Sequence, residues 1–246
     1  FLVQEGIYDE FVTRLAKAVK TLNVGNGMDV PLNPFDKKRA CGGSSGGSGG
    51  ISQIADFPHV SLGESTGGSI VAPASFCGVV GFCPTYGRVS RYGLMDYANS
   101  LDKIGAMSKK ITDTALVQEL ISGYDNKEST SLNEPVDKYT DWISQDTKGI
   151  RVGVIKECFG DGVDDAVEKE VWNGIKKLED AGIKYDEISL PLVKKYGVET
   201  YYLIAMSETS TNLAKYCGMR YGAHAKLKEG FNEYFSKVRS KNFGKE

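Results

Sequence analysis

Residues 42–48 read Gly42-Gly43-Ser44-Ser45-Gly46-Gly47-Ser48, and residues 63–70 read Gly63-Glu64-Ser65-Thr66-Gly67-Gly68-Ser69-Ile70. Repeats of glycine and serine are typical of flexible linkers. The second stretch, however, lies among apolar residues that indicate a buried strand ending at the glycines, namely Val60, Leu62, Ile70 and Val71. We therefore predict that the two stretches shape a functional site.

The chemistry of that site follows from its residue types. Glycine lets the backbone bend sharply and approach a ligand closely. Successive backbone N–H groups in such a turn form a concavity that binds anions. A serine at the end of the turn, here Ser69, can attack a carbonyl carbon while the N–H groups hold the oxyanion. The pattern favours acyl transfer over a linker.

The group that would activate the serine is less evident from the sequence. The chain has two histidines, His59 and His224, and a Ser-His-Asp triad would need one of them. His59 precedes a strand-like run and His224 lies in a polar, helical stretch, so we expect both to be ordinary surface or hydrogen-bonded residues. Ser-Lys variants of the triad also exist, in which a hydroxyl between nucleophile and lysine could relay the proton.

Longer motifs carry a resemblance to a known family. From about residue 33 to the C-terminus the chain resembles the amidase signature family, and within it the branch of the A subunits of glutamyl/aspartyl-tRNA amidotransferases. The matching stretches are 41–48, 65–70, 73–82, 84–94, 99–105, 153–157, 207–216 and 220–222. Because these motifs match in sequence order, the resemblance is specific.

The resemblance implies a role for several residues. Ser69 falls on the nucleophile and Ser44 on a bridging serine that follows a cis peptide bond. The oxyanion hole falls on the N–H groups of the turn, those of Thr66, Gly67, Gly68 and Ser69. Tyr202, which follows Tyr201, falls on a tyrosine that lines the glutamine pocket, although both tyrosines also fit as core aromatics on a helix.

Some family positions hold other residues here. The family's catalytic lysine lies in an upstream apolar-Lys-Asp-Asn run, and this chain contains no Lys-Asp-Asn. Ser65 stands in place of an acid, Val71 in place of an arginine, and Cys83 in place of a lysine. Two functions remain open. One is an amide hydrolase, the glutaminase subunit that supplies ammonia for amidation of mischarged Glu-tRNA(Gln) or Asp-tRNA(Asn). The other is a catalytically silent fragment or binding subunit of the same fold.

The resemblance and the composition together define the expected partners. The substrate would be glutamine or a related amide, and subunits B and C or their equivalents would complete the complex. ATP and Mg²⁺ are implied only for the partner subunit, with no cofactor in this chain. A net charge of −2 gives no basic footprint, so we expect contact with tRNA only through partners.

Cysteine use and hydropathy bear on the compartment. The five cysteines are scattered and odd in number, without a Cys-x-x-Cys pair, which favours buried free thiols in a reducing compartment. No apolar run approaches the length of a membrane span, and no signal peptide is evident. We expect a cytoplasmic protein without membrane contact, with the mitochondrion as the alternative.

The pattern of elements predicts an α/β fold, with a mixed, partly parallel sheet core flanked by helices, as in an incomplete amidase signature fold. The strongest signal is a strand over 150–155, a helix capped by Asp164 or Asp165, and a strand over 184–190, an order that favours parallel pairing. The other predicted elements are a helix over 8–22, a loop over 31–50, a short helix from 51, strands over 60–63 and 78–82, a helix from Thr112 or Asp113 to 121, and helices from about 197.

The N-terminal end differs in its resemblance. Residues 1–29 resemble a short segment of aldehyde dehydrogenases, without that family's catalytic motifs. We therefore predict a separate N-terminal helical segment over 1–30 and a partial amidase signature domain over 31–246. Neither a Walker motif nor a G-x-G-x-x-G after a strand is present, which does not favour nucleotide binding by this chain.

Overall fold

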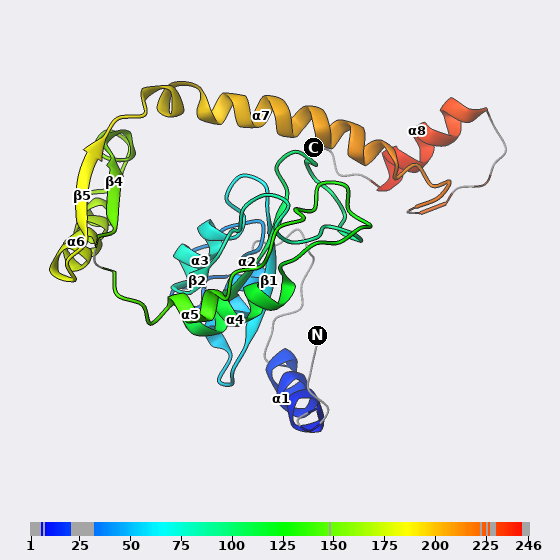
Figure 1. Cartoon of the computed structure of the whole chain (residues 1–246). Helices are drawn as coiled ribbons and strands as arrows, with labels where there is room; N and C mark the ends of the chain where they lie inside the picture. The colour runs from blue at the N-terminus through cyan, green and yellow to red at the C-terminus, as the bar shows by residue number, and fades with distance from the viewer. Residues whose placement is uncertain are drawn as a thin grey trace. The chain divides into compact units, whose positions relative to one another are not determined.

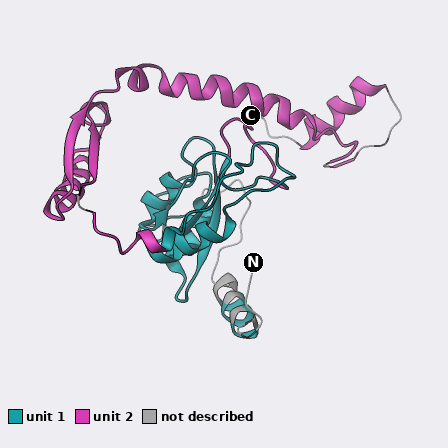
Figure 2. Cartoon of the chain, viewed as in Figure 1, with its two compact units in different colours: residues 1–92, 103–140 teal, residues 93–102, 141–246 magenta. Residues whose placement is uncertain are grey.

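The computed structural model describes residues 6, 8–20, 32–147, 149–221, 223–224, 226 and 230–242. The chain divides into two compact units, residues 1–92 with 103–140 and residues 93–102 with 141–246 (Figure 2). The boundary predicted near residue 30 falls outside the described residues and stays a prediction. The first helix, α1, spans Tyr8–Lys20, two residues short of the prediction, where the described stretch ends.

The first unit is built around a three-stranded antiparallel sheet of order β1-β3-β2. Figure 1 labels two of these strands, β1 and β2. Strand β3 (Lys103–Ser108) lies in the centre, with Leu62 of β1 opposite Ala106 and Val80 of β2 opposite Ser108. Strands β1 and β2 span Val60–Ser65 and Val80–Gly81, so the two predicted strands are confirmed with shifted ends. The sequence did not predict β3, because its residues 105–108 are all buried and so lack alternation.

The core of this unit lies beside the turn that ends at Ser69. Ile70, Ala74 and Met107 form a buried cluster with Val79 packed against it. Ala74 belongs to helix α3 (Val71–Cys77), which ends at Gly78 in the left-handed conformation with φ of 62°. A glycine can adopt this conformation without steric cost, which makes it a suitable helix terminator. The residue after Ser69 is therefore anchored in the core.

Helix α2 corrects one prediction. It spans Gly46–Ile54, so the glycines 46–50 that we predicted as loop are helical. A Cβ at Gly49 would lie 3.1 Å from the Pro73 carbonyl oxygen and 3.3 Å from the Cys77 sulfur. Glycine thus allows α2 and α3 to approach closely, and this packing outweighs the low helix propensity of the residue.

Two further helices complete the first unit. Helix α4 spans Ile111–Ile121, and its N-cap is Lys110, two or three residues before the predicted caps Thr112 or Asp113 and without a side-chain cap. The short helix α5 spans Tyr139–Trp142. Arg88 ties the preceding loop together by donating to the Tyr139 hydroxyl at 3.0 Å and to the Glu134 carbonyl at 3.3 Å.

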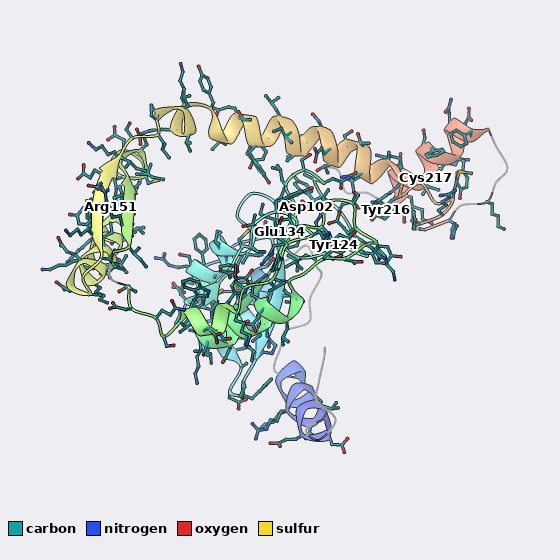
Figure 3. The ribbon with its side chains drawn as sticks, viewed as in Figure 1. Asp102, Tyr124, Glu134, Arg151, Tyr216 and Cys217 are labelled. Carbon is teal, nitrogen blue, oxygen red and sulfur yellow. The ribbon has the colours of Figure 1, made fainter. Side chains whose placement is uncertain are left out.

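The second unit contains the predicted strand–helix–strand motif. Strands β4 (Arg151–Ile155) and β5 (Lys184–Ile188) pair in parallel, with Arg151 opposite Lys184, which confirms the parallel pairing. The short helix η2 (Lys156–Cys158) follows β4. Asp164 caps α6 (Asp165–Asp180) by accepting from the Ala166 N–H at 2.9 Å. Arg151, labelled in Figure 3, forms an ion pair with Asp186 of β5.

Helix α7 (Pro191–Ala214) holds the loop 93–102 within the same unit. Thr209 and Asn212 both donate to the Tyr97 carbonyl, at 3.1 and 3.0 Å, and the Ser100 N–H donates to Glu208 at 2.9 Å. The buried carboxylate of Asp102 (Figure 3) accepts from the N–H groups of residues 97 and 98. Helix α7 begins about six residues earlier than predicted, since Pro191 suits the first helical turn. The last helix, α8, spans Phe231–Asn242.

Large parts of the second unit expose apolar side chains. On α6, the exposed apolar residues include Val167, Val171 and Leu178. On α7, exposed apolar residues include Leu192, Val193, Val198, Leu203, Ile204 and Met206. Across the described ranges, no helix combines the length and hydropathy that crossing a bilayer requires.

Candidate active site

The two serine-glycine stretches meet at one end of β1. The first leads into α2 through Ser45, and the second comprises the last three residues of β1 and the turn 66–70 before α3. The Ser45 N–H donates a 3.2 Å hydrogen bond to the Ser69 carbonyl oxygen. The structure therefore brings the two stretches together, as the sequence predicted, although 24 positions separate Ser45 from Ser69.

The turn before Ser69 is ordered by its own side chains. Thr66 donates from its hydroxyl to Glu64 Oε1 at 2.9 Å, and the Gly68 N–H donates to the Ser65 hydroxyl at 3.2 Å. Gly68 has a φ of 147°, which side chains rarely adopt. Ser65 is almost fully buried. Its hydroxyl thus provides an acceptor where the family resemblance has an acid.

Some of the predicted oxyanion donors are available and one is not. Among the described residues, the N–H groups of Gly67 and Ser69 have no hydrogen-bond partner. The N–H of Gly68, which the resemblance placed in the oxyanion hole, is bonded to Ser65 instead. An oxyanion bound in this turn would have to replace that 3.2 Å bond if it is to use the Gly68 donor.

The two candidate catalytic serines differ in exposure. Ser44 is exposed and follows a cis peptide bond from Gly43, while Ser69 is half-buried. Within the described ranges, neither hydroxyl forms a hydrogen bond with another residue. The structure therefore shows no hydrogen bond between Ser44 Oγ and Ser69 Oγ, and the assignment of both serines as catalytic stays a prediction.

Within the described ranges, neither histidine bonds Ser69. His59 Nε2 lies 2.8 Å from the hydroxyl of Ser61, at the start of β1, whereas the Ser69 turn follows the end of this strand. A strand of six residues spans roughly 20 Å. Burial lowers the pKa of His59, which favours its neutral form. His224 pairs with the Gly218 carbonyl in the second unit.

In the part of the chain that the structure describes, no lysine side chain bonds the Ser44 hydroxyl, so the lysine base that the resemblance implies is not found there. Lys37 and Lys38, which precede Ser44, are exposed, and neither side chain bonds the Ser44 hydroxyl. Val71, at the family's arginine position, is 47% exposed at the start of α3. These positions therefore supply no cation to the site.

Tyr202 lies in the second unit, on α7. Its side chain is 51% exposed and forms an edge-to-face pair with Tyr201, with ring centroids 5.1 Å apart. Such a pair gains from the quadrupoles of the two rings. Its role in a glutamine pocket stays a prediction.

Two buried thiols lie next to the glycines of α2, that of Cys77 near Gly49 and that of Cys41 near Gly50. Cys41 precedes the first serine-glycine stretch and Cys77 ends α3, and the Cys77 sulfur lies 3.7 Å from the Cys41 carbonyl oxygen. Burial, with a contribution from Cys41, raises the pKa of the Cys77 thiol to about 12. Such a thiol is inert at neutral pH. All five cysteines are free, but only Cys41, Cys77 and Cys217 are buried, whereas Cys158 is exposed.

A serine that follows a glycine-rich N–H turn at the end of a strand is typical of enzymes that attack carbonyl carbons. Comparison with known proteins identifies the family of the chain. The amidase family model matches residues 16–246, and the chain belongs to that family. The match begins upstream of residue 33, where we had identified the resemblance.

The most similar curated relatives include the A subunits of glutamyl-tRNA(Gln) amidotransferases from two organisms. The Listeria monocytogenes protein is 44% identical over 255 aligned positions, covering 98% of this chain and 52% of the relative. The Methanosarcina barkeri protein is 48% identical over 214 positions, covering 87% of this chain and 44% of the relative. The chain thus spans about half the length of the curated relatives it matches.

Solved structures show the same fold. The A subunit of the Thermotoga maritima glutamyl-tRNA(Gln) amidotransferase matches with a TM-score of 0.69 at 36% identity, covering 87% of this chain and 43% of that one. A peptide amidase from Stenotrophomonas maltophilia matches with a TM-score of 0.68 at 28% identity, covering 87% and 44%. The predicted fold class, mixed α/β as in the amidase signature fold, is confirmed.

Proposed function

We propose that this chain carries the nucleophile and the oxyanion-binding turn of a serine amidase, and that its substrate is the side-chain amide of glutamine. The observation that carries the proposal is the hydrogen bond from the Ser45 N–H to the Ser69 carbonyl, because it holds the two serine-glycine stretches together. The similarity to the A subunits of glutamyl-tRNA(Gln) amidotransferases supports the choice of substrate.

In the proposed reaction, Ser69 Oγ attacks the carbonyl carbon of the amide. Its proton passes through the Ser44 hydroxyl to a base, which the family resemblance implies is a lysine. The N–H groups of residues 66–69 hold the negative charge on the carbonyl oxygen. The C–N bond then breaks, the nitrogen takes up the proton and leaves as ammonia, and water hydrolyses the Ser69 ester.

The ammonia would serve partner subunits. Because the relatives are named as subunits of a tRNA amidotransferase, we propose that equivalents of subunits B and C use the ammonia to amidate mischarged tRNA. ATP and Mg²⁺ enter the proposal only through a partner subunit. With a net charge of −2, this chain would reach tRNA through those partners. We place this activity in the cytoplasm, with the mitochondrion as the alternative.

A second candidate function is a catalytically silent binding subunit. It is favoured by Val71 at the family's arginine position and by the absence of a lysine bonded to Ser44 in the described ranges. Such a subunit would keep the fold without a reactive serine. Reactivity at Ser69 therefore separates the two functions.

The test is ammonia release from glutamine by the purified 246-residue chain, together with labelling by a fluorophosphonate and peptide mass spectrometry. We expect Ser69 to be labelled and turnover to stay well below about 1 s⁻¹, because no lysine bonds Ser44 in the described ranges and a serine without a base loses most of its acceleration. Asparagine in parallel reactions reports the amide preference. Turnover faster than this would show that a base does activate Ser69. A Ser69 that is not labelled would favour the catalytically silent subunit.

A further inference from the structure

Ser45 lies next to the proposed proton relay but has no part in the chemistry above. We propose that Ser45 is a positioning residue: its hydroxyl takes the place of a neighbouring strand at the open edge of β1 and so fixes the Ser69 turn. The inference rests on the proposed function, since it concerns the reactivity of Ser69.

The edge of β1 explains what the Ser45 side chain does. Among the described residues β1 is an edge strand that pairs only with β3, so the backbone groups of alternate residues point away from the sheet. Ser45 Oγ accepts from the Glu64 N–H at 3.2 Å and donates to the Glu64 carbonyl at 3.1 Å. One hydroxyl therefore bonds both backbone groups of one residue, as a paired residue does in an antiparallel ladder.

The backbone of Ser45 continues this contact to the nucleophile. Its N–H donates to the Ser69 carbonyl at 3.2 Å, and its carbonyl accepts from the Gly49 N–H at 3.0 Å in the first turn of α2. The same residue thus connects the end of β1, the Ser69 turn and the start of α2. If the Ser45 side chain no longer bonded Glu64, the backbone of Ser45 would be less fixed, and so would its N–H bond to the Ser69 carbonyl.

Gly63 provides the space for this arrangement. A Cβ at position 63 would lie 2.9 Å from Ser45 Oγ, 3.2 Å from Ser45 Cβ and 3.0 Å from Ile70 Cγ1. These distances are shorter than ordinary van der Waals contacts, so Ser45 packs directly on the backbone of β1. Ser45 and Ile70, which follows the nucleophile, therefore contact the same glycine.

Ser48 offers a matched control on the same strand edge. Its hydroxyl donates to the Leu62 carbonyl at 2.8 Å, and none of its side-chain bonds in the described ranges reaches the Ser69 turn. Ser48→Ala removes a hydrogen bond to β1, as Ser45→Ala does, without touching the connection to Ser69. A general loosening of the sheet would affect both variants alike.

The experiment measures the labelling kinetics of Ser69 by a fluorophosphonate, which bonds its phosphorus to Ser69 Oγ and releases fluoride with the proton. The saturation curve separates probe binding (KI) from the bond-forming rate (kinact). For Ser45→Ala we expect kinact to fall about tenfold or more with KI unchanged, because small displacements of a reacting group cost large factors in rate. For Ser48→Ala we expect kinact within about twofold of the unmodified chain, since its hydrogen bond goes to Leu62 and not to the Ser69 turn.

Thermal unfolding of each variant accompanies the kinetics. If Ser45→Ala does not fold, Ser45→Cys replaces it, because cysteine keeps the shape of serine with a much weaker donor. An unchanged kinact, a change in KI alone, or an equal fall in kinact for the Ser48 variant would overturn the positioning role. Failure of the unmodified chain to label at Ser69 would instead overturn the proposed function, and the inference with it.

Discussion

Alanine at position 69 is expected to abolish fluorophosphonate labelling of this chain and to remove whatever ammonia release it shows from glutamine. The reason is chemical: Ser69→Ala removes the only atom that forms the covalent bond in the proposed reaction. In a serine protease, loss of the nucleophile alone lowers kcat by about 10⁶. The measurement is labelling followed by intact-mass and peptide analysis.

Ser75→Ala provides the control for this prediction. Ser75 lies on α3, six positions after Ser69, and it is exposed. Its substitution should leave labelling unchanged. Labelling that persists at full rate in Ser69→Ala would show that another residue is the nucleophile.

The second large effect concerns Gly105 in the central strand β3. A Cβ at this position would lie 2.0 Å from the Phe82 carbonyl oxygen, a backbone atom that cannot move aside without breaking the β2–β3 contact. The Phe82 N–H itself bonds the Ala106 carbonyl at 3.0 Å. We expect Gly105→Ala to destabilise the fold by about 4 kcal/mol or more, measured by denaturant unfolding.

Gly174 is the matched glycine for comparison. It lies in α6, is exposed, and a Cβ there would meet no other atom within 4 Å. Gly174→Ala should therefore stabilise the protein by about 0.5–1 kcal/mol, because alanine restricts the unfolded chain and favours helix. A Gly105→Ala chain that unfolds at the same midpoint as the unmodified chain would contradict the close approach of β2 and β3.

The sequence predicted those elements whose signals are local. Asp164 followed by an amphipathic run predicted the cap and the start of α6, and the structure confirms both. The flanking apolar runs predicted β4 and β5, and their order in the chain predicted the parallel pairing. Each of these signals is contained within a few residues, so neighbours distant in sequence do not alter it.

The elements that escaped prediction depend on contacts distant in sequence. β3 is buried along residues 105–108, which erases the alternation that identifies a half-exposed strand. The first turns of α2 are rich in glycine, and Gly49 among them packs against Pro73 and Cys77 of α3. At Gly49 of α2 and at Gly105 of β3, the small size of glycine allows close packing. Composition alone does not distinguish this use of glycine from its use in flexible segments.

The candidate site was predictable in outline only. The repeated serine-glycine stretches and their apolar neighbours indicated that both belong to one site, and the Ser45–Ser69 hydrogen bond brings them together. The bond between Gly68 and Ser65 was not predictable, because a buried serine beside a glycine turn has no distinct pattern. Ser44 and Ser45 are also identical in type, so their sequence could not indicate which hydroxyl bonds β1 and which remains exposed.

The central claim is that Ser44 and Ser69 belong to one catalytic site. The most direct test is a crystal structure of the chain after phosphonylation, with the distance between Ser44 Oγ and Ser69 Oγ as the measurement. The account predicts a distance of about 3 Å, that of a hydrogen bond from the Ser44 hydroxyl to the ester oxygen of Ser69. A separation of more than about twice that distance would contradict a shared site.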